Sequence, residues 1–165
     1  MMDYQTAVRG AFFDIAGVAE TPDEVAAQAR YLDDGLLFLQ EGKIIALLPW
    51  QEGEAFLHPL KGYVDLRGKL LLPGFVDAHV HYPQTEMIGA FGEQLLEWLT
   101  TYTFPVESQF ADAEYAQEIA QFFVNQLISH GTTTALVFCT LHPASVEALF
   151  SDCLLYTSDA ADDLT

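Results

Sequence analysis

The sequence has 165 residues, of which 24 are acidic and 6 are basic, so its formal net charge is −18. A charge of this size and sign repels phosphate backbones and anionic membrane surfaces, and we therefore expect neither a nucleic-acid nor a membrane partner. Hydrophobic residues make up 51% of the sequence, which suffices for the buried core of one domain or of parts of two. No apolar run approaches the ~20 residues that a membrane-spanning helix needs.

The N-terminal segment and the cysteine content indicate the compartment. The segment lacks a basic stretch followed by an apolar one, so we expect no secretory signal. Cys139 and Cys153 are the only cysteines, and two cysteines cannot form a dense disulfide framework. We therefore expect a cytoplasmic protein with reduced thiols.

The first part of the sequence, residues 1–70, predicts a small β-rich module in which short apolar runs alternate with turn signals. Glu41–Gly42 is expected to join two strands by a tight turn. A short helix is expected over 21–32, because Thr21 can serve as its N-cap and Pro22 as its first residue. The expected strands lie within 7–15, 35–40, 43–49 and 62–74.

From residue 70 onward, strands and helices alternate. The run LLLPGFVDAHVH, residues 70–81, is nearly continuous in apolar residues until its end and is typical of one buried parallel strand. The stretch 111–131 predicts the clearest helix, with His130 in its last turn and Gly131 after it. This order of elements is typical of α/β proteins with a barrel or a doubly wound sheet. The other expected elements are a helix over 92–104 that ends at Pro105, a strand over 132–140 and a helix from about Pro143. The residues of the 111–131 helix that we expect to be buried are Ile119, Phe122, Phe123 and Leu127. Glu114 and Glu118 are expected on its solvent-exposed face.

Two of the five histidines, His79 and His81, stand one residue apart at the end of this apolar strand. Alternate side chains of a strand share one face, so both imidazoles can converge on a single metal ion, and Asp77 lies on the same face. Neutral imidazoles bind Zn²⁺, Fe²⁺ and related ions, so the pair indicates a metal without identifying it. Asp77 is placed to orient an imidazole by accepting its hydrogen bond. A chance pair on a half-polar strand is the alternative.

Longer stretches around this pair are similar to a known family. Residues 79–112, HVHYPQTEMIGAFGEQLLEWLTTYTFPVESQFAD, and residues 130–150, HGTTTALVFCTLHPASVEALF, resemble the guanine deaminase family of the amidohydrolase superfamily. The resemblance extends from about Thr6 to Phe150. It implies an α/β fold in which a β-rich module over 1–70 is followed by the first two βα units, 71–150, of an incomplete TIM-like (β/α)8 barrel.

The resemblance also implies a site and a reaction. His79 and His81 would be ligands of one Zn²⁺ ion, and His81 and Gln84 would contact a purine, since a carboxamide offers both a donor and an acceptor. The reaction would be the hydrolytic deamination of guanine to xanthine and ammonia by a metal-activated hydroxide. The remaining ligands and the acid/base glutamate would lie on later barrel strands, so this chain by itself is expected to be an inactive fragment. A homodimer is implied for the full-length family.

Two other functions stay open on the sequence: deamination of another aminopurine or a pterin, and a non-catalytic metal-binding module. The tail, residues 151–165, carries four acids without a helical or strand period, and we expect it to be disordered or not native to the fold. The remaining candidates are assigned to packing, to a helix end or to the surface, and they are His130, His142, Trp98, Tyr102, Phe104 and Cys139.

Overall fold

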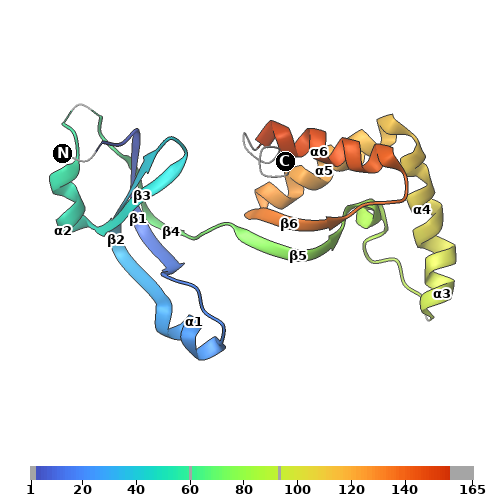
Figure 1. Cartoon of the computed structure of the whole chain (residues 1–165), viewed down its shortest axis with the longest axis horizontal. Coiled ribbons are helices and arrows are strands. Elements are labelled where there is room, and N and C mark those ends of the chain that lie inside the picture. The colour runs from blue at the N-terminus through green and yellow to red at the C-terminus, as the bar shows by residue number, and fades with distance from the viewer. Residues whose placement is uncertain (1–2, 60, 93, 157–165) are drawn as a thin grey trace. The chain divides into compact units, whose positions relative to one another are not determined.

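The computed structural model describes residues 3–59, 61–92 and 94–156 (Figure 1). The chain divides into two compact units, Met1–Pro73 and Gly74–Thr165, whereas the sequence predicted a boundary after residue 70. Among the helices of the described residues, none combines the length and the apolar character that crossing a membrane requires.

The first unit is built on a four-stranded sheet with the order β3-β2-β1-β4. Its elements are β1 (Thr6–Ile15), α1 (Pro22–Gln28), β2 (Ala29–Gln40), β3 (Lys43–Pro49), α2 (Trp50–Gly53), the 3-10 turn Glu54–Phe56 and β4 (Val64–Leu71). The pairs β1–β2 and β2–β3 are antiparallel, whereas β4 runs parallel to β1. Glu41 and Gly42 both have positive φ, 50° and 73°, and form the tight turn that the sequence predicts. The core of this unit contains Tyr4, Ala7, Leu36 and Phe38.

Helix α1 begins where the sequence predicts and ends earlier than expected. The Thr21 hydroxyl accepts a hydrogen bond from the Glu24 N–H, and the Glu24 carboxylate accepts one from the Thr21 N–H, which completes a capping box. The helix was expected to reach residue 32. It stops at Gln28 because the chain from Ala29 onward forms β2 and pairs with the end of β1.

The second unit is a strand–helix–strand–helix arrangement. Its elements are β5 (Phe75–His81), the 3-10 turn η2 (Tyr82–Met87), α3 (Leu95–Trp98), the π-helical turn η3 (Leu99–Thr103), α4 (Phe104–Ser108), the 3-10 turn η4 (Gln109–Ala111), α5 (Ala113–Ser129), β6 (Thr132–Phe138) and α6 (Pro143–Tyr156). β5 and β6 are parallel neighbours, as a βαβ crossover requires. Figure 1 shows α5 and α6 along the same side of the two strands. The core between them contains Tyr82, Phe110, Ala116, Ile119, Ala120, Phe123, Val124, Ala148 and Leu149.

The run from Leu70 to His81 is not one strand, contrary to our expectation. Leu70 and Leu71 end β4 and pair with β1 in the first unit. Pro73 has no N–H and cannot continue a ladder of hydrogen bonds, so the strand ends before it. β5 begins only at Phe75, whose N–H donates to the carbonyl of Gly131 at 2.8 Å.

Pro105 does not stop the helical segment, which is a second correction. The N–H of Phe104 bonds to the carbonyl of Leu99, five residues earlier, and this widened π turn leads directly into α4. Pro105 then lies in the first turn of α4, where a missing N–H costs nothing.

The buried face of α5 differs from the expected stripe at one position. Ile119 and Phe123 are buried, but Phe122 is 52% exposed. The buried face is centred instead on Ala116 and Ala120, with other apolar residues beside them. The small side chains of the two alanines allow α6 to pack closely. The helix ends as predicted, with His130 as its C-cap and Gly131 at a φ of 84°.

The expected loss of structure from Ser151 onward is wrong for the first residues of the tail. Helix α6 continues through Tyr156, and Asp152 is only 2% exposed. Its carboxylate accepts a hydrogen bond from the Gln117 side chain of α5 at 2.9 Å. Leu149 and Cys153 are one helical turn apart and both pack against α5. These two contacts stabilise the helix beyond Phe150. The rest of the tail, residues 157–165, lies outside the described residues.

Candidate metal and substrate site

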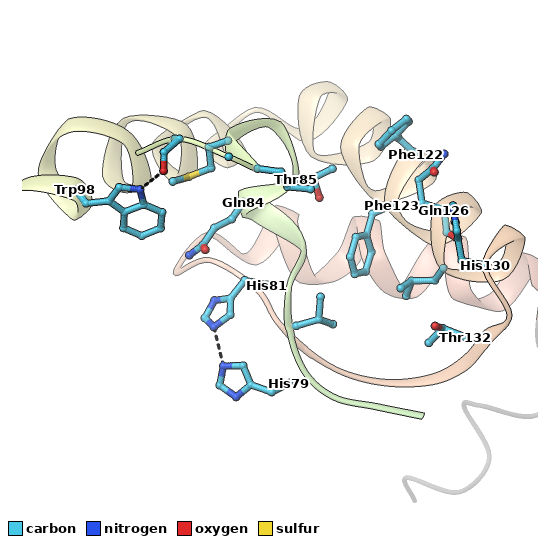
Figure 2. A pocket seen from close by; sticks show the side chains of 16 residues that line it. His79, His81, Gln84, Thr85, Trp98, Phe122, Phe123, Gln126, His130 and Thr132 are labelled. Atoms are coloured by element: carbon cyan, nitrogen blue, oxygen red, sulfur yellow. Dashed lines mark hydrogen bonds between the residues drawn. The ribbon is translucent and has the colours of Figure 1, made fainter. Parts of the chain in front are cut away.

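The imidazoles of His79 and His81 lie together at the C-terminal end of β5. Their Nε2 atoms are 3.1 Å apart and their ring centroids are 5.1 Å apart. Figure 2 shows both rings on the same side of the strand, pointing toward one another. Strand alternation therefore places the two side chains as the sequence predicts.

The ring of Phe138, at the end of β6, lies against both imidazoles. Its centroid is 4.6 Å from that of His79 and 4.8 Å from that of His81, and it is stacked on His81 with an interplanar angle of 13°. The parallel register explains this contact, because His81 and Phe138 are direct partners in the ladder. The sequence analysis missed Phe138. The sequence did contain a signal for it, because Phe138 is the last residue of its strand and His81 is the last residue of the neighbouring strand.

The two imidazole nitrogens fit two positions of a tetrahedral metal shell. Two nitrogens that bind one Zn²⁺ ion at ~2.05 Å lie about 3.3 Å apart, close to the 3.1 Å between the Nε2 atoms of His79 and His81. Within the described residues, no group of three or more histidine, cysteine, aspartate or glutamate side chains is placed to hold a metal ion. The chain thus brings together a pair of candidate ligands, and the rest of a four-coordinate shell would come from other residues.

Asp77 makes a different contact from the one expected. Its carboxylate accepts a hydrogen bond from the backbone N–H of His79 at 3.0 Å. In the described part of the chain, no hydrogen bond joins Asp77 to either imidazole ring. Its carboxylate therefore fixes the backbone of the strand end, and its role in orienting a ring stays a prediction.

Gln84 lies in the η2 turn directly after β5, and its side chain is half-buried. Its amide nitrogen donates to the Glu107 carboxylate of α4 at 3.3 Å. Glu107 was not singled out from the sequence, although it closes the YTFPVE block that carries part of the family resemblance. The contact ties the loop after β5 to the helical segment that follows it.

A cleft of about 730 Å³ runs along β5, within the size range of small-molecule sites. Figure 2 shows its lining, to which α5 contributes Phe122 and Gln126. Trp98 closes one end and donates its indole N–H to the carbonyl of Ala90 at 2.9 Å. The polar lining residues are His79, His81, Gln84, Thr85, Gln126, His130 and Thr132.

The other histidines and aromatic residues fall outside the imidazole pair. The His130 ring contacts the carbonyl of Gln126 at 2.8 Å, as expected at a helix end, although it also lines the cleft. His142 follows β6, where its N–H donates to the Thr140 hydroxyl. Tyr102 and Phe104 were expected to pack, but both are exposed.

Tyr82, next to His81 in the chain, anchors the site to the core. Its side chain is fully buried, and its hydroxyl donates to the backbone carbonyl of Ser145 in α6 at 2.6 Å. Burial raises the pKa of this hydroxyl well above its ordinary value. Burial likewise raises the pKa of the Cys139 thiol, in line with its expected role as a small apolar residue. No disulfide joins Cys139 to Cys153 in the described residues.

The parallel strands β5 and β6, each followed by a helix, define the class of fold, which is the start of an α/β barrel. The model of the amidohydrolase family matches residues 70–157, slightly more than half of the chain, and the chain belongs to this family.

Relatives and solved structures are similar to the chain over most of its length. Guanine deaminase from Escherichia coli (strain K12) is 51% identical over 144 residues, which cover 87% of this chain and 33% of that protein. The structure of E. coli guanine deaminase gives a TM-score of 0.86 at 49% identity, covering 91% of this chain and 35% of that one. Guanine deaminase from C. acetobutylicum, solved with guanine in its active site, gives 0.70 at 28% identity, covering 88% and 32%. An adenosine deaminase from Xanthomonas campestris, solved with bound zinc, shares the fold at 18% identity and a TM-score of 0.62, covering 90% and 32%.

The chain therefore spans about a third of the length of the relatives that it matches. The predicted α/β fold, with an incomplete barrel, is confirmed by this partial coverage of the guanine deaminase structure.

Proposed function

We propose that this chain supplies part of the active site of a guanine deaminase, which hydrolyses guanine to xanthine and ammonia. The observation that carries the proposal is the pair of imidazoles at the C-terminal end of β5, with Nε2 atoms 3.1 Å apart beside a cleft of about 730 Å³. The C-terminal ends of parallel strands are where α/β barrels carry their active sites. The similarity to guanine deaminases over most of this chain supports guanine as the substrate.

His79 and His81 would hold one Zn²⁺ ion through their Nε2 atoms. When bound, such an ion lowers the pKa of a coordinated water toward ~7 and so provides hydroxide at neutral pH. Asp77 would hold the strand end in place through the backbone N–H of His79, which keeps the two rings on one face. His81, the nearer ligand to the η2 turn, would also contact the purine.

Gln84 would bind the purine by hydrogen bonds from its carboxamide. An ionised carboxylate can only accept hydrogen bonds, so the contact with Glu107 orients the amide nitrogen of Gln84 toward Glu107. The amide oxygen is then left to accept from an N–H group, and guanine carries several such groups. Glu107 would therefore fix which end of Gln84 the substrate meets.

The domain organisation, compartment and assembly belong to the same proposal. We assign residues 1–70 to the β-rich module and 71–150 to the start of the hydrolase barrel. We also propose a cytoplasmic homodimer that binds neither nucleic acid nor membrane, in keeping with the net charge of −18.

A chimeric enzyme tests the proposal directly. Residues 6–150 of this chain would replace the corresponding segment of E. coli guanine deaminase, and xanthine formation and zinc content would be measured. We expect turnover, and we expect His79→Ala to remove both turnover and most of the zinc. Gln84→Ala should raise KM for guanine by roughly 10- to 100-fold with the zinc content unchanged, because it leaves a buried polar partner unpaired.

Gln126→Ala is the matched control, since Gln126 is an amide of the same cleft that contacts neither imidazole. A Gln84→Ala chimera with parental KM and kcat would remove Gln84 from the substrate site. A chimera that deaminates other aminopurines or pterins in preference to guanine would contradict the proposed substrate.

A further inference from the structure

One aromatic side chain faces the imidazole pair from the neighbouring strand. Phe138 ends β6, pairs with His81 in the parallel ladder, and keeps 42% of its surface exposed. Its ring nevertheless lies within 4.8 Å, centroid to centroid, of both imidazoles. Its side chain thus lies on the face of the sheet that carries the histidines, opposite the helices.

This face of the sheet offers the imidazoles little other support. In the described residues, the only ring contacts of His79 and His81 are with each other and with Phe138. The neighbouring side chain on the same face of β6, Leu136, is 61% exposed and carries no ring that could stack on an imidazole. Without Phe138, both imidazoles would be side chains on an open strand end, with several rotamers available to each.

We propose that Phe138 is a positioning residue for the imidazole pair. Its ring stacks on His81 and lies against His79, so that one flat surface limits the rotation of both rings at once. The Nε2 atoms are then held facing one another before an ion arrives, and the ordering cost of binding falls. The metal-dependent part of this inference rests on the proposed metal-binding role of His79 and His81, whereas the ordering of the rings does not.

The first test uses the 165-residue chain and Zn²⁺ alone, measured by competition with a chromophoric chelator. Phe138→Leu keeps an apolar side chain but removes the flat ring, and it should weaken zinc binding by about three- to tenfold. Phe138→Tyr restores the ring and should bind zinc as the parent does. Leu136→Ala is the matched control on the same strand and face, and it should leave the affinity unchanged. Circular dichroism confirms that each variant is folded.

The second test needs no metal. Ring-current shifts of the imidazole protons, followed by NMR in the metal-free chain, should be present in the parent and in Phe138→Tyr and lost in Phe138→Leu. If these shifts persist in a folded Phe138→Leu chain, or if that variant binds zinc as tightly as Leu136→Ala, the positioning role is wrong. A parent chain that binds no zinc beyond the level of His79→Ala would contradict the proposed metal site, while the NMR comparison still decides the role of Phe138.

Discussion

Tyr82 connects the candidate site to the core of its unit, and removing its hydroxyl gives a direct measure of that connection. Tyr82 follows His81 in the chain, and its completely buried side chain contacts Phe110 of η4, Phe123 of α5 and Ser145 of α6. Its hydroxyl donates to the Ser145 carbonyl at 2.6 Å, a contact between residues 63 positions apart in the chain. Tyr82→Phe removes this hydrogen bond and keeps the ring, which lies edge-on to Phe110.

The expected loss of stability is about 1 kcal/mol. A buried neutral hydrogen bond contributes about 0.5–1.5 kcal/mol net, and the cost rises when its partner is left unpaired. The Ser145 carbonyl lies within α6 and can still accept a hydrogen bond from the helix, so the cost stays near the middle of that range. For a unit of this size, about 1 kcal/mol lowers Tm by roughly 4–8 °C.

The stability that Tyr82→Phe loses should also depend on pH, and it should become smaller at alkaline pH. The folded state raises the pKa of Tyr82 above its ordinary value of 10.0, so the folded protein retains this proton more strongly than the unfolded chain. The stabilisation is therefore complete below about pH 10 and is lost as the pH rises beyond it. The difference in stability between the parent and Tyr82→Phe should accordingly be full at pH 7–9 and shrink above pH 10.

Urea unfolding followed by near-UV circular dichroism measures both effects. Tyr102→Phe is the control, because Tyr102 is exposed and its hydroxyl makes no hydrogen bond among the described residues. It should change the free energy of unfolding by less than ~0.5 kcal/mol. Equal stabilities for Tyr82→Phe and Tyr102→Phe at pH 7 would refute the anchoring role.

The other predictions concern stability and turnover. Asp152→Asn should stabilise the chain at pH 7 by about 1 kcal/mol in urea unfolding, because burial raises the pKa of Asp152 and one of its carboxylate oxygens has no partner in the described residues. The gain should vanish as the pH falls below the ordinary value of 3.8, and a destabilised Asn variant would contradict it. Thr21→Ala removes the cap of α1 and should cost about 1 kcal/mol, measured by the same method, whereas Thr21→Ser should restore most of it. With zinc and guanine added, the 165-residue chain alone should form no xanthine, because its described residues hold no cluster of three metal ligands. Turnover that vanishes in His79→Ala would refute that expectation.

Elements whose signals are local could be predicted from the sequence. The capping box at Thr21, the turn at Glu41–Gly42 and the C-cap at Gly131 each depend on a few adjacent residues, and all three occur where expected. The faces of the helices could not be predicted so well. Phe122 was expected to be buried but is exposed. The expectation failed because an apolar stripe in the sequence does not reveal which of its residues will meet another helix.

The candidate site divides in the same way. The shared face of His79 and His81 follows from strand alternation, and the position of Gln84 follows from its place directly after the strand. Phe138 lies 57 residues after its partner His81 in the chain, and Glu107 lies 23 residues after its partner Gln84. Their contacts depend on the register of β6 and on the path of α4, which a single sequence does not specify.

Strand alternation gives the two faces of the sheet separate functions. Val80 and Val137 point toward the helices and pack against the core, whereas His79, His81 and Phe138 point away from it. A substitution on the helix side, such as one at Tyr82, therefore acts first on folding. A substitution on the other side, such as Phe138→Leu, should act mainly on the imidazole pair, because Val80 and Val137 are the neighbouring strand residues that pack against the core. Stability in urea should therefore fall more in Tyr82→Phe than in Phe138→Leu, whereas zinc binding should fall more in Phe138→Leu.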